Sequence, residues 1–257
     1  MTDDAPTAGL REAVLGDDQR FIGVPMVLHT PPTLAGVDPA TVFTTDGYLR
    51  QARLGRRLLE TGTLAGPDAD ASPPALLVAP VLSLNFHGVP AECRAQAEER
   101  IRRVCDLGDP FDPAEPGSGP RVLVAFYDGD RETGLFGAEL CASLGVRAYF
   151  FPLLADAPPP APTDRLGEDQ LAGIGREHEL CFHTASHRAA AEVTGDDLAR
   201  EVLEPVDRLT RLGGRPPRLA AWRGGARFDP ASLGDRTLRE LGLGWLVSNW
   251  SVEPVPA

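Results

Sequence analysis

Residues 178–187 read HELCFHTASH and hold three of the five histidines of the chain. An apolar run of strand length ends at His183, and a short polar stretch follows it. If the chain turns into a helical loop there, His183 and His187 lie at positions i and i+4 and converge on one side, as in two-histidine zinc sites. The alternative is that they are core histidines satisfied by backbone hydrogen bonds. A cluster at a strand end is more typical of a site.

A third ligand candidate follows another apolar run, residues 121–130, which read RVLVAFYDGD. Asp128 comes directly after four apolar residues, where a carboxylate is costly unless it is paired or metal-bound. His29, His87 and Arg223 also follow hydrophobic runs. In parallel α/β barrels the chemistry collects where strands end and loops begin. The strand ends therefore predict one shared site.

Working outward from these stretches, apolar runs of strand length alternate with amphipathic runs of helix length, which is typical of an α/β fold. The sequence predicts seven strands, at 25–29, 76–86, 121–127, 147–151, 179–183, 218–222 and 245–248. It predicts helices near 47–61, 91–106, 133–144, 167–176, 195–212 and 231–241, and Pro205 should kink the fifth of them.

Residues 121 to about 254 resemble the polysaccharide deacetylase family, the NodB homology domain of carbohydrate esterase family 4. AFYDG at 125–129 is similar to the motif TFDDG, and GVRAYFF at 145–151 to GVKATFF. EHELCFHTASH at 177–187 is similar to GHEIGSHTxxH, and WRGGARF at 222–228 approximates the RxPxG or RAGR motif. The resemblance implies a divergent member with a distorted (β/α)7 barrel.

The resemblance also implies a divalent metal, most often Zn²⁺, held by Asp128, His183 and His187. Such a triad leaves open positions for water and for an acyl oxygen. Arg223 takes the place of the family's arginine, which orients the catalytic carboxylate. Its alternative role is an ordinary surface ion pair.

Two departures from the family pattern concern proton transfer. The family's general base is Tyr127 here, and a phenol with a pKa of about 10 is a poor base at neutral pH unless the metal or Arg223 lowers it. Asp130 is the nearest substitute. The resemblance also ends before the family's last strands and its LxH motif, whose histidine is the general acid.

The N-terminal segment can supply the missing parts. We expect residues 1–110 to contribute the strands 25–29 and 76–86 to the barrel, in place of the family's last strands, beside a core of residues 121–257. His29 or His87 would then be the general acid. The alternative is that both are satisfied histidines in an added subdomain.

Composition excludes several classes of function. All 25 basic residues are arginine, so lysine Schiff-base chemistry, pyridoxal phosphate anchoring and a P-loop lysine are impossible. The net charge of −12 makes nucleic acid an unsuitable partner. The acidic N-terminus lacks signal-peptide character, and no apolar run is long enough for a membrane span, which predicts a cytoplasmic protein. The four cysteines have no CxxC spacing and are expected to be buried thiols.

These observations favour a metal-dependent hydrolase that removes an N-acyl group, such as acetyl, from an amino sugar or a small metabolite that contains one. Two alternatives stay open at this stage. One is a catalytically impaired protein that keeps the metal site for binding. The other is altered chemistry at the same metal, with Tyr127 as acid or electrophile.

Overall fold

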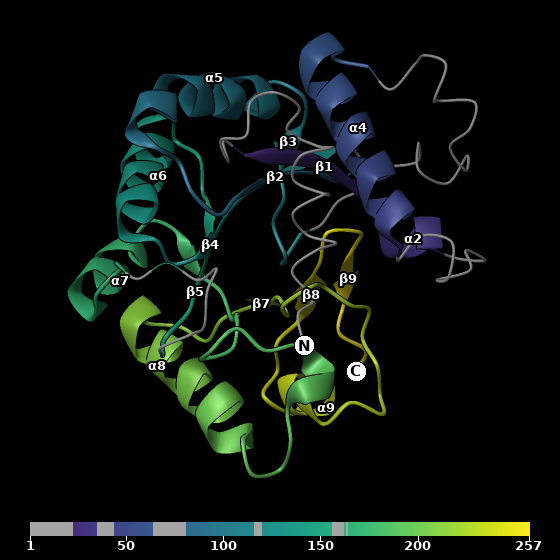
Figure 1. Ribbon diagram of the computed structural model, residues 1–257, viewed down its shortest axis with the longest axis vertical. Helices are drawn as coiled ribbons and strands as arrows, with labels where there is room; N and C mark the ends of the chain where they lie inside the picture. The colour runs from purple at the N-terminus through teal and green to yellow at the C-terminus, as the bar shows by residue number, and fades with distance from the viewer. Residues whose placement is uncertain (1–22, 35–43, 64–80, 116–119, 156–161, 163) are drawn as a thin grey trace.

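The computed structural model describes residues 23–34, 44–63, 81–115, 120–155, 162 and 164–257, and it shows a mixed α/β protein (Figure 1). The larger sheet has the order β1-β2-β4-β5-β6, and β3 also pairs with β4. Its strands are parallel except for β1, which runs antiparallel to β2. Their bounds are β1 Val24–Leu28, β2 Val81–Phe86, β3 Asp109–Pro110, β4 Arg121–Asp128, β5 Tyr149–Pro152 and β6 Glu179–Leu180.

A smaller sheet follows, with β7 (Leu219–Ala220) parallel to β8 (Trp245–Val247) and β8 antiparallel to β9 (Val252–Pro254). Single bridges join it to the larger sheet on both sides, between Phe182 and Ala220 and between His29 and Ser251. Because the described residues form only single bridges here and no continuous ladder, the closed seven-stranded barrel stays a prediction.

Helices α5, α6, α7 and α8 follow one another around the outside of the larger sheet (Figure 1). Helix α4 packs against β1 and begins with a cap in which Thr44 Oγ1 accepts from Gly47 N–H. The helices and helical turns are α2 Pro31–Leu34, α4 Thr45–Thr61, η2 Ala91–Cys93, α5 Arg94–Cys105, α6 Arg131–Ser143, α7 Glu168–Ile174, η3 Ala190–Glu192, η4 Ala199–Leu203, α8 Glu204–Gly213 and α9 Leu233–Glu240.

Side chains of neighbouring strands line up in layers, because strand residues alternate between the two faces of a sheet. On the face toward the outer helices, Phe126 stacks between Phe86 and Phe150, with ring centroids 4.9 and 5.0 Å apart. On the inner face, one residue further along each strand, Tyr127 stacks between His87 and Phe151, at 4.9 and 4.7 Å. The layer of His87, Tyr127 and Phe151 lies on the inner face, at the carboxyl edge of the sheet.

The structure confirms the mixed α/β class and changes some details of the elements. β3, β9 and α2 are short elements that the apolar pattern did not indicate. Residues 76–80 of the expected second strand lie outside the described residues. The four cysteines are free thiols, and all but the half-buried Cys105 are buried. Within the described part of the chain, no helix is long and apolar enough to cross a membrane.

Candidate metal centre

Asp128, His183 and His187 lie together at the carboxyl edge of the sheet. Asp128 ends β4, His183 comes shortly after β6, and His187 lies in the loop that follows. Each offers one ligand atom, and the three atoms lie within 4.8 Å of one another. Asp128 Oδ1 is 3.4 Å from His183 Nε2 and 3.7 Å from His187 Nε2. Donors about 2.1 Å from a tetrahedral zinc ion lie about 3.4 Å apart, so these spacings fit.

Two of the three candidate ligands have a left-handed backbone. Asp128 has φ 64° and His187 has φ 62°, and Thr184 between the histidines has φ 57°. Such conformations cost about 1 kcal/mol or more in residues other than glycine and concentrate at functional sites, although Asp and His tolerate them better than most. At Asp128 the left-handed conformation breaks the strand alternation directly after Tyr127, so the carboxylate reaches the histidines.

One hydrogen bond of His183 shows which of its two ring nitrogens faces Asp128. Nδ1 lies 2.8 Å from the carbonyl oxygen of Ala221, which only accepts, so Nδ1 carries the proton. Nε2 is therefore the ring nitrogen that faces Asp128 Oδ1, at 3.4 Å. That oxygen is buried and has no hydrogen-bond partner among the described residues. A cation at this point would give the buried oxygen a partner, so the residues fit a divalent metal.

The electrostatics of the cluster agree with a cation site. Burial alone would raise the pKa of Asp128, but the nearby imidazoles, that of His183 first, hold it below its usual range. Burial lowers the pKa of His187 to about 4, and the neighbouring His183 adds to the shift. At neutral pH the cluster therefore offers a carboxylate and a neutral imidazole from His187, which are the forms that bind a metal.

A cavity of about 50 Å³ opens beside the cluster, which is room for a few water-sized groups. Its lining brings together strand ends from both sheets: His87, Tyr127, His183, His187, Ala221, Trp222, Arg223, Gly224, Gly225, Val247, Ser248 and Asn249. Among these, His87 follows β2 and Tyr127 belongs to β4. The structure thus brings five of the predicted side chains to one cavity: His87, Tyr127, His183, His187 and Arg223.

Tyr127 lies in the cavity wall, but its surroundings keep the phenol protonated. Burial raises its pKa, and the charges of Cys181 and Asp128 add to the effect. The ring packs between His87 and Phe151 and meets the edge of the His183 ring at 5.6 Å. These contacts give Tyr127 a packing role beside the ligands, and its high pKa argues against a general base.

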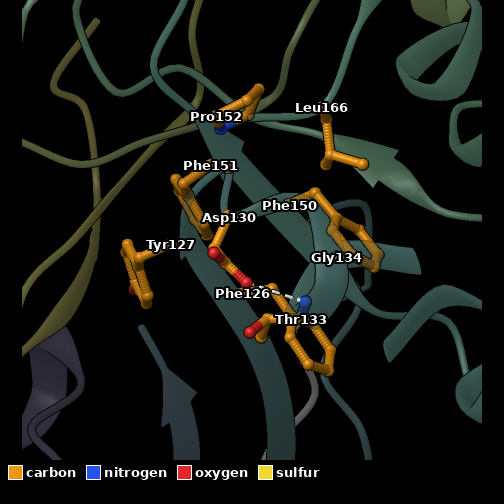
Figure 2. Close-up of a pocket in the computed structure, with 10 residues that line it drawn as sticks. Phe126, Tyr127, Asp130, Thr133, Gly134, Phe150, Phe151, Pro152 and Leu166 are labelled. Carbon is orange, nitrogen blue, oxygen red and sulfur yellow. Dashed lines mark hydrogen bonds between the residues drawn. The ribbon is translucent and has the colours of Figure 1, made fainter. Parts of the chain in front are cut away.

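Asp130 caps a helix and does not line the cavity at the metal cluster. Its Oδ1 accepts a hydrogen bond from the Thr133 backbone N–H at 2.8 Å and caps the N-terminus of α6, and Figure 2 shows this bond. Asp130 lines a second small pocket, with Phe126, Gly134 and Leu166, and is absent from the lining of the cavity at the metal cluster. The local geometry therefore favours a helix cap over a substitute base.

Arg223 reaches the cavity but pairs elsewhere. Its Nη2 donates to Glu192 Oε1, and both side chains are about half exposed, at 46% and 45%. Exposed ion pairs of this kind are weak. No carboxylate occurs among the described residues that line the cavity, so Arg223 has none there to orient. The surface ion pair, which was the alternative role, is the one observed.

His29 is separated from His87 along the first two strands, because β1 is antiparallel to β2. Leu28 pairs with Val81 at the start of β2, whereas His87 follows Phe86 at its end. The six residue steps from Val81 to His87, at about 3.4 Å each, put Leu28 and His87 roughly 20 Å apart along the ladder. His29 is buried, is absent from the cavity lining and has Arg50 and Arg227 as charged neighbours. Of the two candidates for the general acid, only His87 faces the cavity.

Sequence reasoning missed several residues at the site, among them Asn249 and Glu201. Asn249 lines the cavity just after β8, and the same rule that selected His87 and Asp128 at strand ends would have found it. Glu201 contacts the loop between the two histidines from a helix far along the chain. No sequence motif marks that contact.

No family model and no curated protein matches this chain. Solved structures do match it. IcaB from Ammonifex degensii has a TM-score of 0.52 and 18% identity, covering 65% of this chain and 82% of its own. BC0361, a polysaccharide deacetylase from Bacillus cereus, has a TM-score of 0.44 and 15% identity, and the match covers 56% of this chain and 50% of BC0361. The BpsB deacetylase domain from Bordetella bronchiseptica has a TM-score of 0.41 and 17% identity, and the match covers 57% of this chain and 69% of the BpsB domain. The similarity to IcaB shows that this chain shares the fold of that protein.

Proposed function

We propose that this protein is a metal-dependent hydrolase that removes a small N-acyl group from an amino sugar or a small metabolite containing one. The observation that carries the proposal is the convergence of Asp128 Oδ1 with His183 Nε2 at 3.4 Å and His187 Nε2 at 3.7 Å, at a site where Asp128 and His183 are buried. Asp128 Oδ1 has no hydrogen-bond partner among the described residues, and a cation there would supply one. The deacetylase-type fold supports the same conclusion.

Asp128, His183 and His187 would hold the cation, most suitably Zn²⁺ given one carboxylate and two imidazoles. When bound, it supplies Lewis acidity to an acyl oxygen and to a water molecule. The chain's own groups orient the substrate and move protons. His87 lies against Tyr127 in the cavity wall and is the group placed to protonate a leaving nitrogen. The small volume of the cavity suits an acetyl group.

Metal analysis of the purified protein tests the proposal first. We expect about one divalent cation per chain, as one three-residue site predicts. The double variant His183→Ala, His187→Ala should lose both the metal and the hydrolysis of N-acetylated amino sugars. The control His87→Ala should keep the metal and lose rate, because His87 moves a proton in this proposal. Metal retained in the double variant, or a wild-type protein that binds none, contradicts the site.

A second candidate function is binding without turnover. It is favoured by the absence of a carboxylate base among the described cavity residues, together with the raised pKa of Tyr127. The variant Tyr127→Asp separates the two candidates by putting a carboxylate at this position. If the wild type binds metal but is inert and the variant hydrolyses N-acetyl groups, the protein is a binding protein. If the wild type is active and the variant gains nothing, the hydrolase stands.

A further inference from the structure

One buried carboxylate holds the loop between the two histidine ligands. Glu201 in η4 is fully buried. Its Oε2 accepts a hydrogen bond from the Ser186 backbone N–H at 3.0 Å, and its Oε1 accepts one from the Ser186 hydroxyl at 2.9 Å. Ser186 stands directly before His187. The position of this carboxylate therefore defines where the backbone enters His187.

The backbone of Glu201 contacts the same loop, and the sequence explains why it can. In a regular α-helix the carbonyl of residue 201 would accept the N–H of residue 205. Residue 205 is proline and has no N–H, and the chain makes a π-helical turn at 199–203 instead. The Glu201 carbonyl accepts the Ala185 N–H at 3.2 Å. Glu201 thus accepts three hydrogen bonds from the loop, one from Ala185 and two from Ser186.

The loop needs such support because its backbone is strained. Thr184 and His187 are left-handed at φ 57° and 62°. Conformations of this kind persist only where the surroundings impose them. Other hydrogen bonds also hold the loop. The Arg188 N–H donates to Thr184 Oγ1 at 2.9 Å, and the Leu154 and Ala155 N–H groups donate to the Ala185 carbonyl.

A fully buried charge at this position is otherwise hard to explain. Burying a carboxylate is costly unless it is paired and hydrogen-bonded. Arg200 Nε lies 3.1 Å from Glu201 Oε1 and Arg188 Nε lies 3.7 Å from it, which compensates the charge. Both oxygens meanwhile point at Ser186. The carboxylate therefore pairs with Arg200 and also contacts the ligand loop through both of its oxygens.

We propose that Glu201 is a positioning residue that presets the loop 184–187, so that His187 faces Asp128 and His183 before any metal binds. The inference rests on the proposed metal site. Glu201 is not one of the three candidate ligands, and it would act through Ser186. Groups that orient metal ligands in this way typically change metal affinity by about 10–100-fold when they are lost.

Zinc titration of the metal-free protein with a competing chelator tests this role. Glu201→Gln and Ser186→Ala are compared with Glu204→Gln, an exposed glutamate three residues further along. We expect zinc affinity to fall about 10–100-fold in Glu201→Gln, less in Ser186→Ala, which keeps the backbone bond, and not at all in Glu204→Gln. The visible spectrum of bound Co²⁺ should change in Glu201→Gln, whereas a purely structural role would leave it unchanged.

Glu201→Ala, which removes both oxygens, should bind zinc more weakly than Glu201→Gln, which keeps one. If Glu201→Ala does not fold, Glu201→Gln and Ser186→Ala decide the question. If these two variants keep the zinc affinity and the Co²⁺ spectrum of the wild type, while His187→Ala loses zinc, the positioning role is overturned and the metal site stands. A wild-type protein that binds neither metal would overturn both.

Discussion

At the residue scale, Asp130 is bonded as a helix cap, and a pair of variants tests whether it is more than that. Asp130→Ala removes the acceptor for the Thr133 N–H and should lower the free energy of unfolding by about 1 kcal/mol. Asp130→Asn should stay near the wild-type value, because asparagine caps as well as aspartate. Urea unfolding of the metal-free protein measures both. A loss of hydrolysis by about 10²–10⁴ in a stable Asp130→Asn would instead identify Asp130 as the base.

His29 makes the stability of the protein depend on pH. Burial, with Arg50 and Arg227 adding to it, lowers the pKa of His29 from 6.5 to about 4. The unfolded chain therefore binds a proton in this window that the folded chain does not. The stabilising contribution is fully present above pH 6.5 and is lost as the pH falls toward 4. Each such proton corresponds to about 1.4 kcal/mol per pH unit.

The variant His29→Asn cannot take up this proton. We expect its unfolding free energy to fall less steeply than that of the wild type between pH 6.5 and 4. Both proteins are unfolded with urea in the presence of a chelator, so that the metal ligands affect them equally. Parallel curves over this range would show that His29 is not buried in its neutral form.

At the scale of the elements, the outer helices pack closely on the sheet where glycines permit it. Gly137 in α6 faces Phe126, and a Cβ at this position would overlap the ring. The ring cannot move freely, because it is stacked between Phe86 and Phe150. Gly137→Ala should therefore lower the free energy of unfolding by about 1–3 kcal/mol, although alanine favours helix.

Gly173 in α7 is the matched control. It is exposed, and a Cβ there would meet no atom within 4 Å. Gly173→Ala should be neutral or stabilise the protein by up to about 1 kcal/mol. Thermal unfolding of the two variants distinguishes helix propensity from packing. If both variants are stabilised, α6 does not approach β4 as closely as the structure shows.

The sequence predicted elements well where periodicity and burial agree. The apolar run before Asp128 became β4, and the amphipathic run at 47–61 became α4, Thr45–Thr61. Elements of two or three residues, such as β3 and β9, are too short to show a period. The kink expected at Pro205 appears as the π-helical turn η4 just before it. Its consequence, the contact of Glu201 with Ser186, joins segments that no local pattern connects.

At the scale of the whole molecule, strand direction decided which of the predicted site residues lie together. The motif spacing placed Asp128, His183 and His187, because parallel strands bring their carboxyl ends to one edge. The same rule does not bring His29 to the cavity, since periodicity gives the position of a strand but not its direction. β1 is antiparallel, so its end lies at the start of β2. His87 follows a parallel strand and reaches the cavity.

The division into a segment 1–110 and a core 121–257 leads to the last prediction, which concerns whether the core can fold alone. β2 pairs with β4 along six residues, from Val81 and Arg121 to Phe86 and Phe126. Removing residues 1–110 would leave this edge of β4 unpaired and would take Phe86 and His87 from the two ring stacks at Phe126 and Tyr127. An unpaired apolar strand edge promotes association between chains.

We therefore expect a fragment of residues 111–257 to aggregate or to unfold without cooperativity, whereas the full chain unfolds in one transition. Size-exclusion chromatography and thermal unfolding of both proteins, carrying the same tag, measure the difference. Zinc binding gives an independent readout, because the cavity wall at Tyr127 loses His87 in the fragment. A monomeric fragment that melts cooperatively and binds zinc would mean that the first 110 residues are a separable unit, and that the parallel ladder between β2 and β4 is not needed to hold Asp128 in place.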